Sequence, residues 1–284
     1  MEKKYDVLVP IEQLNRFMKD AAMNRQYGIQ VFFSLDPKKA QALLPPPLKI
    51  TEPSVGYLYI VNIREPTFGP WYMEGGLGIM AQMGDVTGLH FLGLQLSGPG
   101  ALTGMCTGRE TSGLPKKLCE CIHVERVGDE GHCYIERHGV RLVDVKLQMG
   151  QYNQPEVMHT IAGAQEGCSA EHPVDTEGAC ILFRYQLDNG FKNMVMTYYD
   201  SLTRYQQWDP ATAEVTFAST EDDPWAALPV TGVLGAGWMV SDNWVRSQHT
   251  LHEYAKEETD TVMQYLFRGR FDQCTLCNEH QIYE

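Results

Sequence analysis

The stretch Gly108-Arg-Glu-Thr-Ser-Gly-Leu-Pro-Lys-Lys-Leu118 places two adjacent lysines directly after a proline and between two leucines. In an extended strand successive side chains point to opposite faces, so only one of Lys116 and Lys117 is expected to enter an apolar interior. A buried lysine is costly unless it loses its charge or finds a partner. Imine formation requires a neutral amine, and both desolvation and a second nearby ammonium favour that form. The segment therefore predicts a strand that carries a reactive lysine.

A solvated surface is the alternative location for such a lysine pair, and the chain contains a second pair for comparison. Lys38-Lys39 also follows a proline, but it lies at an expected helix start without flanking apolar residues, so we expect it to face solvent. For Lys116-Lys117 the residues alone leave both interpretations open. Arg109-Glu110 is equally open, because the two side chains can form an ion pair that braces the fold or can support the lysine segment.

Short runs rich in Val, Ile, Tyr and Phe alternate with turn-forming residues between residues 50 and 240. The segment 141–147 alternates polar with apolar residues, as a half-buried strand does. Many short strands without regular helices between them are typical of a largely antiparallel sheet or barrel. The clearest expected strands are 55–63, 89–96, 142–149, 181–187, 194–199 and 214–218.

Helices are expected at both ends of the chain. Apolar residues recur at three- and four-residue steps over 10–24, which predicts a first helix. Asp36 can cap a short helix that ends before the Pro45-Pro46-Pro47 run, since prolines lack backbone donors. A final helix is expected over 246–267. Because the sequence shows no repeat, low-complexity tract or linker, we expect a single domain over 1–284.

The composition excludes several classes of protein. With 284 residues, 43% hydrophobic side chains and a formal net charge of −13, the chain can build a core and is too acidic for a general nucleic-acid binder. The start of the chain does not resemble a secretion signal, and the longest nearly apolar stretch, 227–240, is too short to span a membrane. The eight cysteines are therefore interpreted as reduced thiols of a soluble, cytoplasmic protein.

Two further motifs are weak. The spacing in Gly232-Val-Leu-Gly-Ala-Gly237 is not that of a dinucleotide-binding loop, and no strand–helix–strand context surrounds it, so a packed bend is expected. Cys274-Thr-Leu-Cys277 could supply part of a metal or redox site. Zinc usually needs four ligands, however, and idle thiols are the preferred interpretation. We therefore expect neither a metal nor a cofactor.

The pattern Gly108-Arg-Glu-x-x-x-x-Pro-Lys-Lys-Leu118 resembles the signature of the acetoacetate decarboxylase superfamily. Three further segments resemble the family in the same order along the chain. They are an early helix and its proline-rich exit at 36–50, a Tyr-x-Glu-x-Gly turn at 71–76 and a late segment at 224–230. The resemblance defines a core over 25–255 and leaves 256–284 as a C-terminal extension. It implies an α+β, mainly antiparallel β fold, that is, an acetoacetate decarboxylase-like β-barrel or cone with peripheral helices at both ends.

The resemblance also assigns roles to individual residues. Lys116 is the imine-forming lysine, and Lys117 is a neighbouring cation that favours its neutral form. Glu74 is the pocket carboxylate. Arg109 and Glu110 support the lysine segment, and Glu110 is expected among the catalytic residues. Four side chains are expected to contact the substrate: Arg25, Tyr57, Tyr72 and Arg109.

Two positions depart from the family. The arginine that suits the substrate carboxylate in acetoacetate decarboxylases falls at Arg25 or Gln26 in this chain. A second glutamate of the family's early strand falls near Leu58, which lies between Tyr57 and Tyr59. The machinery for imine formation is thus retained, while the surroundings specific for decarboxylation differ.

The leading hypothesis is a Schiff-base lyase that decarboxylates a small β-keto acid through a lysine imine and an enamine, without a cofactor. The alternative enzyme is a lysine-imine aldolase or dehydratase that uses pyruvate or a related 2-keto acid, since phenols such as Tyr57 can shuttle protons. A third hypothesis, of another class, is a non-catalytic ligand-binding relative. The expected partners are the small keto acid and further copies of the chain in a homo-oligomer, with neither nucleic acid nor membrane.

Overall fold

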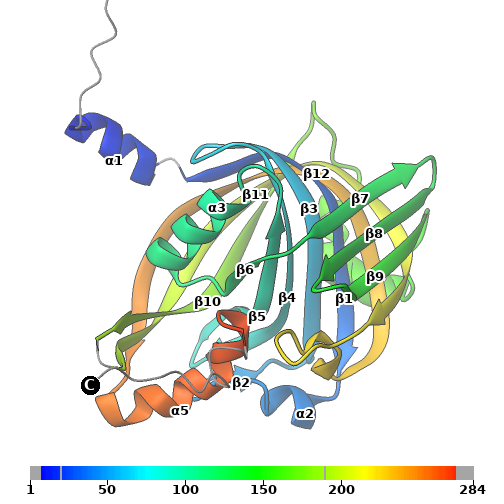
Figure 1. Ribbon diagram of the computed structural model, residues 1–284. Helices are drawn as coiled ribbons and strands as arrows, with labels where there is room; N and C mark the ends of the chain where they lie inside the picture. The colour runs from blue at the N-terminus through cyan, green and yellow to red at the C-terminus, as the bar shows by residue number, and fades with distance from the viewer. Residues whose placement is uncertain (1–7, 20, 189, 273–284) are drawn as a thin grey trace, which may run out of the picture.

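One twelve-stranded, largely antiparallel sheet makes up most of the protein (Figure 1). The computed structural model describes residues 8–19, 21–188 and 190–272. The strands are β1 Ala22–Leu35, β2 Lys49–Ile50, β3 Val55–Pro66, β4 Tyr72–Met83, β5 Val86–Ser97, β6 Lys116–Leu118, β7 Cys121–Val127, β8 Glu130–Arg137, β9 Val140–Met149, β10 Val174–Leu187, β11 Phe191–Phe217 and β12 Val230–Glu253. The helices are α1 Ile11–Lys19, α2 Pro37–Gln41, α3 Ala101–Thr107, α4 Pro155–Ala162 and α5 Lys256–Leu266, with short turns η1 Gly108–Ser112, η2 Gly163–Gln165, η3 Trp225–Ala227 and η4 Phe267–Gly269. Among the described helices, none combines the length and the apolar character that crossing a membrane requires.

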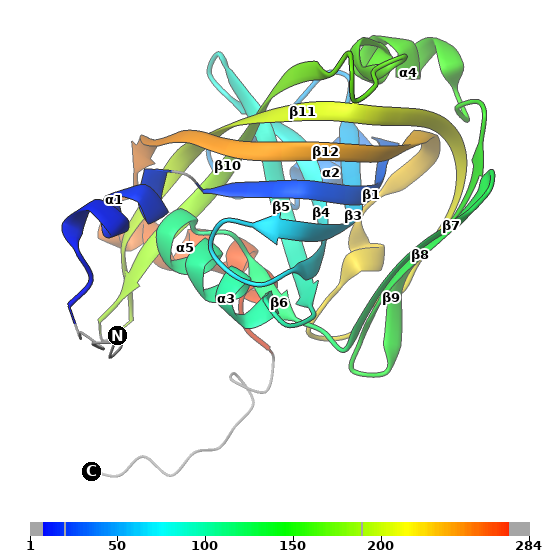
Figure 2. The ribbon, with the colours of Figure 1, turned by 90° about the horizontal axis from the view of Figure 1, so that it is seen from above.

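The order of neighbouring strands is β10-β5-β4-β3-β1-β12-β11-β9-β8-β7. Strand β10 pairs with both β5 and β11, so the strands between them close on themselves. Strands β9, β8 and β7 continue from β11 as an antiparallel flap (residues 121–149) beside this closed part (Figure 2). The expected mainly antiparallel fold with peripheral helices is confirmed, and the arrangement is compatible with a cone.

Buried apolar side chains form two clusters that hold the strands in place. The larger cluster joins β1 and β3 to the flap and includes Phe33, Leu58 and Val145. The smaller cluster contains residues of β4 and β5, among them Tyr72 and Leu94. Full burial of one such side chain contributes about 1.5–3 kcal/mol to folding. The clusters therefore fix the strands that carry the site described below.

Local sequence rules account for several elements. In β9, Val145 is buried and its neighbour Lys146 is exposed, as strand alternation predicts. Helix α2 begins after Asp36, whose Oδ1 accepts hydrogen bonds from both backbone N–H groups of Lys38-Lys39, at 3.0 and 3.1 Å. Both of these lysines are exposed, so their expected location is confirmed.

Two predicted helices have different bounds in the structure. The N-terminal helix ends at Lys19, and β1 begins at Ala22, where it pairs with β12. The C-terminal helix begins only at Lys256, because residues 246–253 extend β12 and pair with β11. At both places hydrogen bonding to a distant strand overrides the local spacing of apolar residues.

The segments 194–199 and 214–217 are strand as expected, but both belong to one long strand, β11, which ends one residue before Ala218. One expectation for the β region is wrong. The glycine-rich segment 232–237 is not a bend but belongs to β12. Its glycines allow close packing, since a Cβ on Gly237 would lie 2.2 Å from the indole of Trp208.

Candidate active site

The lysine segment reaches its position through two unusual turns. After α3, residues Gly108–Ser112 form a π-helical turn, a feature that is frequent at functional sites. Gly113 then adopts a left-handed conformation with φ of 78°, and a side chain there would meet the carbonyl of Phe183. The chain next enters β6, where Lys116 pairs in parallel with Leu94 of β5.

Lys116 and Lys117 are both buried, with 4% of each residue exposed. Lys116 lines a cavity, and its Nζ lies 2.6 Å from Oε2 of Glu74. The Nζ of Lys117 lies 3.2 Å from Oδ1 of Asp223 and 3.1 Å from Oδ1 of Asp272. The expectation that only one lysine enters the interior is therefore wrong, because carboxylates from distant segments compensate the second charge.

The two lysines nevertheless have separate surroundings. Alternation along β6 directs their side chains to opposite faces, and Lys117 does not line the cavity. Because carboxylates already meet its charge, Lys117 is not a free ammonium beside the amine of Lys116. The structure thus places Lys117 in a buried ionic network with Arg137 instead of in the site.

The cavity beside Lys116 has a volume of 840 Å³, and β1, β3, β4, β5, β10, β11, β12 and η1 contribute to its walls. Tyr59 donates a hydrogen bond of 2.5 Å to Oε1 of Glu74, while Lys116 contacts the other carboxylate oxygen. Gly108 leaves room for the lysine, since a Cβ there would lie 2.9 Å from Cε of Lys116. The carboxylate is therefore held between an amine and a phenol in the cavity wall.

The tyrosines and the cysteine near Glu74 are held neutral. Burial, followed by the charge of Glu74, raises the pKa of Tyr59 and the pKa of Tyr72 well above the usual value. Burial also raises the pKa of Tyr57, and it raises the pKa of the Cys180 thiol to about 12. At neutral pH these groups can donate hydrogen bonds, as Tyr59 does to Glu74.

The other predicted site residues lie at different distances from the cavity. Tyr57 lines it, and the ring centroid of buried Tyr72 lies 5.8 Å from Nζ of Lys116. Arg109 is outside the cavity lining, and its Nη1 donates a 3.4 Å hydrogen bond to the carbonyl of Lys116. Glu110 is exposed, lies outside the lining and forms no ion pair with Arg109 within the described residues. Arg109 supports the lysine segment as expected, but the expectations that it contacts the substrate and that Glu110 is catalytic are wrong, because both side chains lie outside the cavity.

Arg25 is not in the site. Its φ of 50° and the register shift between Met23 and Gln26 mark an irregularity of the bulge type in β1. Arg25 is exposed, and its Nη1 lies 2.7 Å from Oε1 of Glu65. Gln26 lines the cavity instead. The prediction that Arg25 binds substrate is therefore wrong, and an uncharged amide occupies the corresponding wall.

Sequence reasoning missed many polar residues of the cavity, among them Gln30, Tyr199 and Tyr205. Gln30 donates a hydrogen bond of 3.0 Å to the hydroxyl of Tyr205. Strand alternation could have identified Gln30, because it lies four residues after Gln26 on the same strand. No local signal marks the two tyrosines, which come from the interior of the long strand β11.

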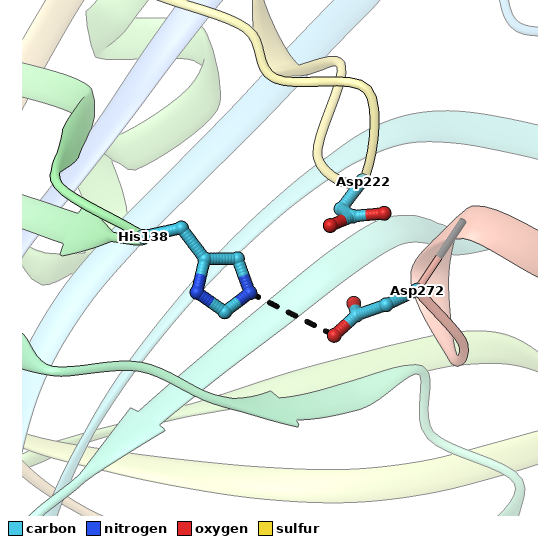
Figure 3. Close-up of side chains that lie close together, drawn as sticks. All are labelled: His138, Asp222 and Asp272. Atoms are coloured by element: carbon cyan, nitrogen blue, oxygen red, sulfur yellow. Dashed lines mark ion pairs between the residues drawn. The ribbon is translucent and has the colours of Figure 1, made fainter. Parts of the chain in front are cut away.

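A second cluster, outside the cavity, contains residue types that can bind metals. Ligand atoms of His138, Asp222 and Asp272 lie within 4.8 Å of one another (Figure 3). Asp272 already pairs with Arg137 at 2.8 Å and with a lysine ammonium, so cationic side chains supply the charge that an ion would bring. We therefore assign no metal to this cluster. The Cys274/Cys277 motif lies outside the described residues.

Known proteins resemble this chain along most of its length. The family model for acetoacetate decarboxylase matches residues 10–255. The chain belongs to the acetoacetate decarboxylase family. A "CLA biosynthesis isomerase" of Lactiplantibacillus plantarum is 31% identical over 270 residues, 92% of each chain. The crystal structure of an acetoacetate decarboxylase from Legionella pneumophila has the same fold, with a TM-score of 0.67 and 14% identity over 88% of this chain and 99% of that one. The enduracididine biosynthesis enzyme MppR, complexed with pyruvate, gives a TM-score of 0.61 and 13% identity over 88% and 93%.

The relative and the structural neighbours of this chain carry the names of enzymes with different reaction types. Membership therefore indicates an enzyme without fixing its reaction. The reaction has to be argued from the lysine, its carboxylate and the shape and charge of the cavity.

Proposed function

We propose that this member of the acetoacetate decarboxylase family is an isomerase that moves a carbon–carbon double bond next to a ketone through an imine on Lys116. One observation carries the proposal: the buried pair of Lys116 and Glu74, 2.6 Å apart, faces a large cavity. Among the described residues the arginine that lines this cavity, Arg246, is already paired with carboxylates. The isomerase of Lactiplantibacillus plantarum, similar over 92% of its length, supports this choice of reaction.

The imine forms without any group from outside the site. Glu74 takes a proton from the ammonium of Lys116, and the free amine adds to the ketone carbon. The protonated carboxyl then gives the proton to the departing oxygen, and water leaves. The products of this step are an iminium on Lys116, a carboxylate on Glu74 and one water molecule.

The iminium then makes proton transfer easy at the neighbouring carbon. Glu74 removes a proton from the CH₂ between the iminium and the double bond, and the electron pair moves into the iminium to give a dienamine. Return of the proton to the far end of the double bond leaves a conjugated iminium. Water adds to the iminium carbon and releases the α,β-unsaturated ketone and the free lysine. The substrate and the product are isomers, so no oxidant or reductant is needed.

The charge of the cavity favours a ketone over a keto acid at the reacting carbon. Within the described residues, the Lys and Arg side chains that line the cavity are Lys116 and Arg246. Arg246 is already paired with Asp200, at 2.6 Å, and with Glu177, at 3.0 Å. A carboxylate next to Lys116 would therefore face Glu74 without a free cation to offset the repulsion.

The size of the cavity also favours a larger substrate. Ligand pockets usually measure roughly 300–1,000 Å³, and 840 Å³ lies in the upper part of that range. A small keto acid would fill only a fraction of this space and would leave room for water that competes for the imine. An extended ketone would exclude that water.

Decarboxylation of a β-keto acid is the second candidate, because the same iminium accepts the electron pair that CO₂ leaves behind. The fold shared with the acetoacetate decarboxylase of Legionella pneumophila supports it. Condensation with pyruvate needs the same lysine, and the pyruvate complex of MppR has a similar fold. Both reactions place a carboxylate near Glu74, which makes them less suited to this cavity.

The experiment compares the reactions on one enzyme preparation. A β,γ-unsaturated ketone is supplied, and the conjugated product is followed by its ultraviolet absorption. In parallel, CO₂ release from a β-keto acid is measured. We expect conjugation that Lys116→Met abolishes and that Lys39→Met, the same change at an exposed lysine, leaves intact. Lysine-dependent CO₂ release without conjugation would replace the isomerase with the decarboxylase.

A further inference from the structure

The chain continues beyond the region that matches the family, and this continuation contacts the lysine segment. The family match ends at residue 255, whereas the described structure runs through α5 and η4 to residue 272 (Figure 1). Residues 269–272 reach the segment 109–117, each by a different contact.

Gly269 brings the C-terminal backbone against the proline that precedes Lys116. A Cβ on Gly269 would lie 2.6 Å from the carbonyl oxygen of Leu92 and 2.9 Å from Cβ of Pro115. Distances this short leave no space for a side chain. The backbone of the C-terminal segment therefore lies in direct contact with the start of β6.

Arg270 is a buried cation that bonds only to carbonyl oxygens within the described residues. Its Nη2 donates hydrogen bonds to the carbonyls of Gly113, at 2.7 Å, and Phe183, at 3.2 Å. Its Nη1 donates to the carbonyl of Leu266 at 3.4 Å. Burial lowers the pKa of Arg270 to about 10. Because a buried charge without a carboxylate is costly, the bonds to the Gly113 turn must offset a large desolvation penalty.

Phe271 and Asp272 continue the contact on both sides of Lys116. The guanidinium of Arg109, which donates to the Lys116 carbonyl, lies 5.3 Å from the ring centroid of Phe271. Asp272 Oδ1 lies 3.1 Å from Nζ of Lys117. Burial raises the pKa of the Asp272 carboxyl, but hydrogen bonds from Arg137 and Lys117 outweigh it and hold that pKa at about 2.

We propose that residues 269–272 form a clamp whose Arg270 and Asp272 are positioning residues for Lys116, a role that rests on the proposed function of this lysine. Arg270 fixes the turn three residues before Lys116, and Asp272 fixes the residue directly after it. The pair of Lys116 and Glu74 then keeps its 2.6 Å separation as the cavity fills and empties. Neither clamp residue touches the cavity, so both act through the backbone of β6.

The test uses Arg270→Met and a matched control, Arg268→Met, which makes the same change at an exposed arginine of the same segment. Borohydride reduction in the presence of an unsaturated ketone measures the rate of imine formation on Lys116. Misplacement of a reacting group by about 1 Å costs roughly 10²-fold in rate. We therefore expect Arg270→Met to slow trapping and to lower kcat by about 10²-fold, with KM changed little. Arg268→Met should behave like the wild type.

Further readouts separate positioning from general stability. The pH profile of trapping should change in folded Arg270→Met, and Arg270→Lys should recover part of the rate. If Arg270→Met does not fold, Asp272→Asn carries the same test. A folded variant of either residue with the rate and the pH profile of the wild type would overturn the clamp.

Hydrogen exchange tests the clamp without any reaction. In Arg270→Met, amides of 108–118 should exchange faster, while amides of the flap at 121–149 should keep their protection. If the wild type forms no imine but 108–118 loosens in the variant, the proposed function fails and the clamp stands. Unchanged exchange in 108–118 would overturn the clamp whatever the wild type does.

Discussion

Replacing Glu74 with glutamine tests whether Lys116 forms the imine while Glu74 transfers the protons. The substitution keeps the shape of the side chain and its bond to Tyr59 but removes the charge that faces Lys116 at 2.6 Å. General acid–base catalysis by a positioned side chain contributes about 10²–10⁴-fold, which equals about 3–5 kcal/mol of activation free energy. Both side chains are almost fully buried, so water replaces the carboxylate poorly. We expect Glu74→Gln to lower kcat for isomerisation by that factor.

The assay separates the proton transfers that move the double bond from the formation of the imine. Glu74→Gln should still give a borohydride adduct on Lys116, although more slowly, while conjugation of the double bond nearly stops. Tyr59→Phe is the matched control, because it removes the hydrogen bond of 2.5 Å and keeps the carboxylate. We expect this control to lose less than about tenfold in kcat, which is 1.36 kcal/mol. A Glu74→Gln enzyme that retains more than a tenth of the wild-type kcat would refute the assignment of Glu74 as the proton carrier.

Three further predictions concern the surroundings of the site. Gly108→Ala places a Cβ 2.9 Å from the Lys116 side chain, so borohydride trapping of the imine should slow by at least about tenfold. The melting temperature should stay near that of the wild type. An unchanged trapping rate would contradict this prediction. Burial, followed by the charge of Arg270, lowers the pKa of His90 from 6.5 to about 4. Between these two pH values the unfolded state binds a proton that the folded state does not, so stability falls as the pH drops from 6.5 towards 4. Urea unfolding at pH 7 and pH 4.5 should show about 2 kcal/mol more acid destabilisation in the wild type than in His90→Asn, and equal losses would contradict it. Asp223→Ala removes a carboxylate that pairs with both Lys117 and Arg137, and it should lower the free energy of unfolding by about 3–5 kcal/mol. Arg25→Ala, in an exposed pair, should lower it by less than about 1 kcal/mol. Similar losses for the two variants in chemical denaturation would show that the buried network is not tightly coupled.

The sequence predicted structure correctly where strand alternation or helix capping determines it. Alternation in β6 correctly separates Lys116 from Lys117, and Asp36 caps α2 as expected. The pairing of Lys116 with Glu74 was available only through the resemblance to the acetoacetate decarboxylase family. Nothing in the local pattern brings residues this far apart in the chain together.

Long-range contacts account for the errors. Lys117 is buried because Asp223 and Asp272, more than a hundred residues away, meet its charge. The segment 246–253 remains a strand because β11 is long enough to pair with it. The irregularity at Arg25 exchanges an arginine for Gln26 on the cavity wall, since a shift of one residue moves a side chain to the other face of a strand.

The residue that captures the substrate covalently decides whether Lys116 is the reactive amine. The protein is incubated with a β,γ-unsaturated ketone, reduced with borohydride, digested and mapped by mass spectrometry. We expect one adduct, on Lys116, with the full mass of the reduced ketone, present in the wild type and in Glu74→Gln and absent in Lys116→Met. An adduct on Lys117, or equal labelling of the wild type and Lys116→Met, would contradict it.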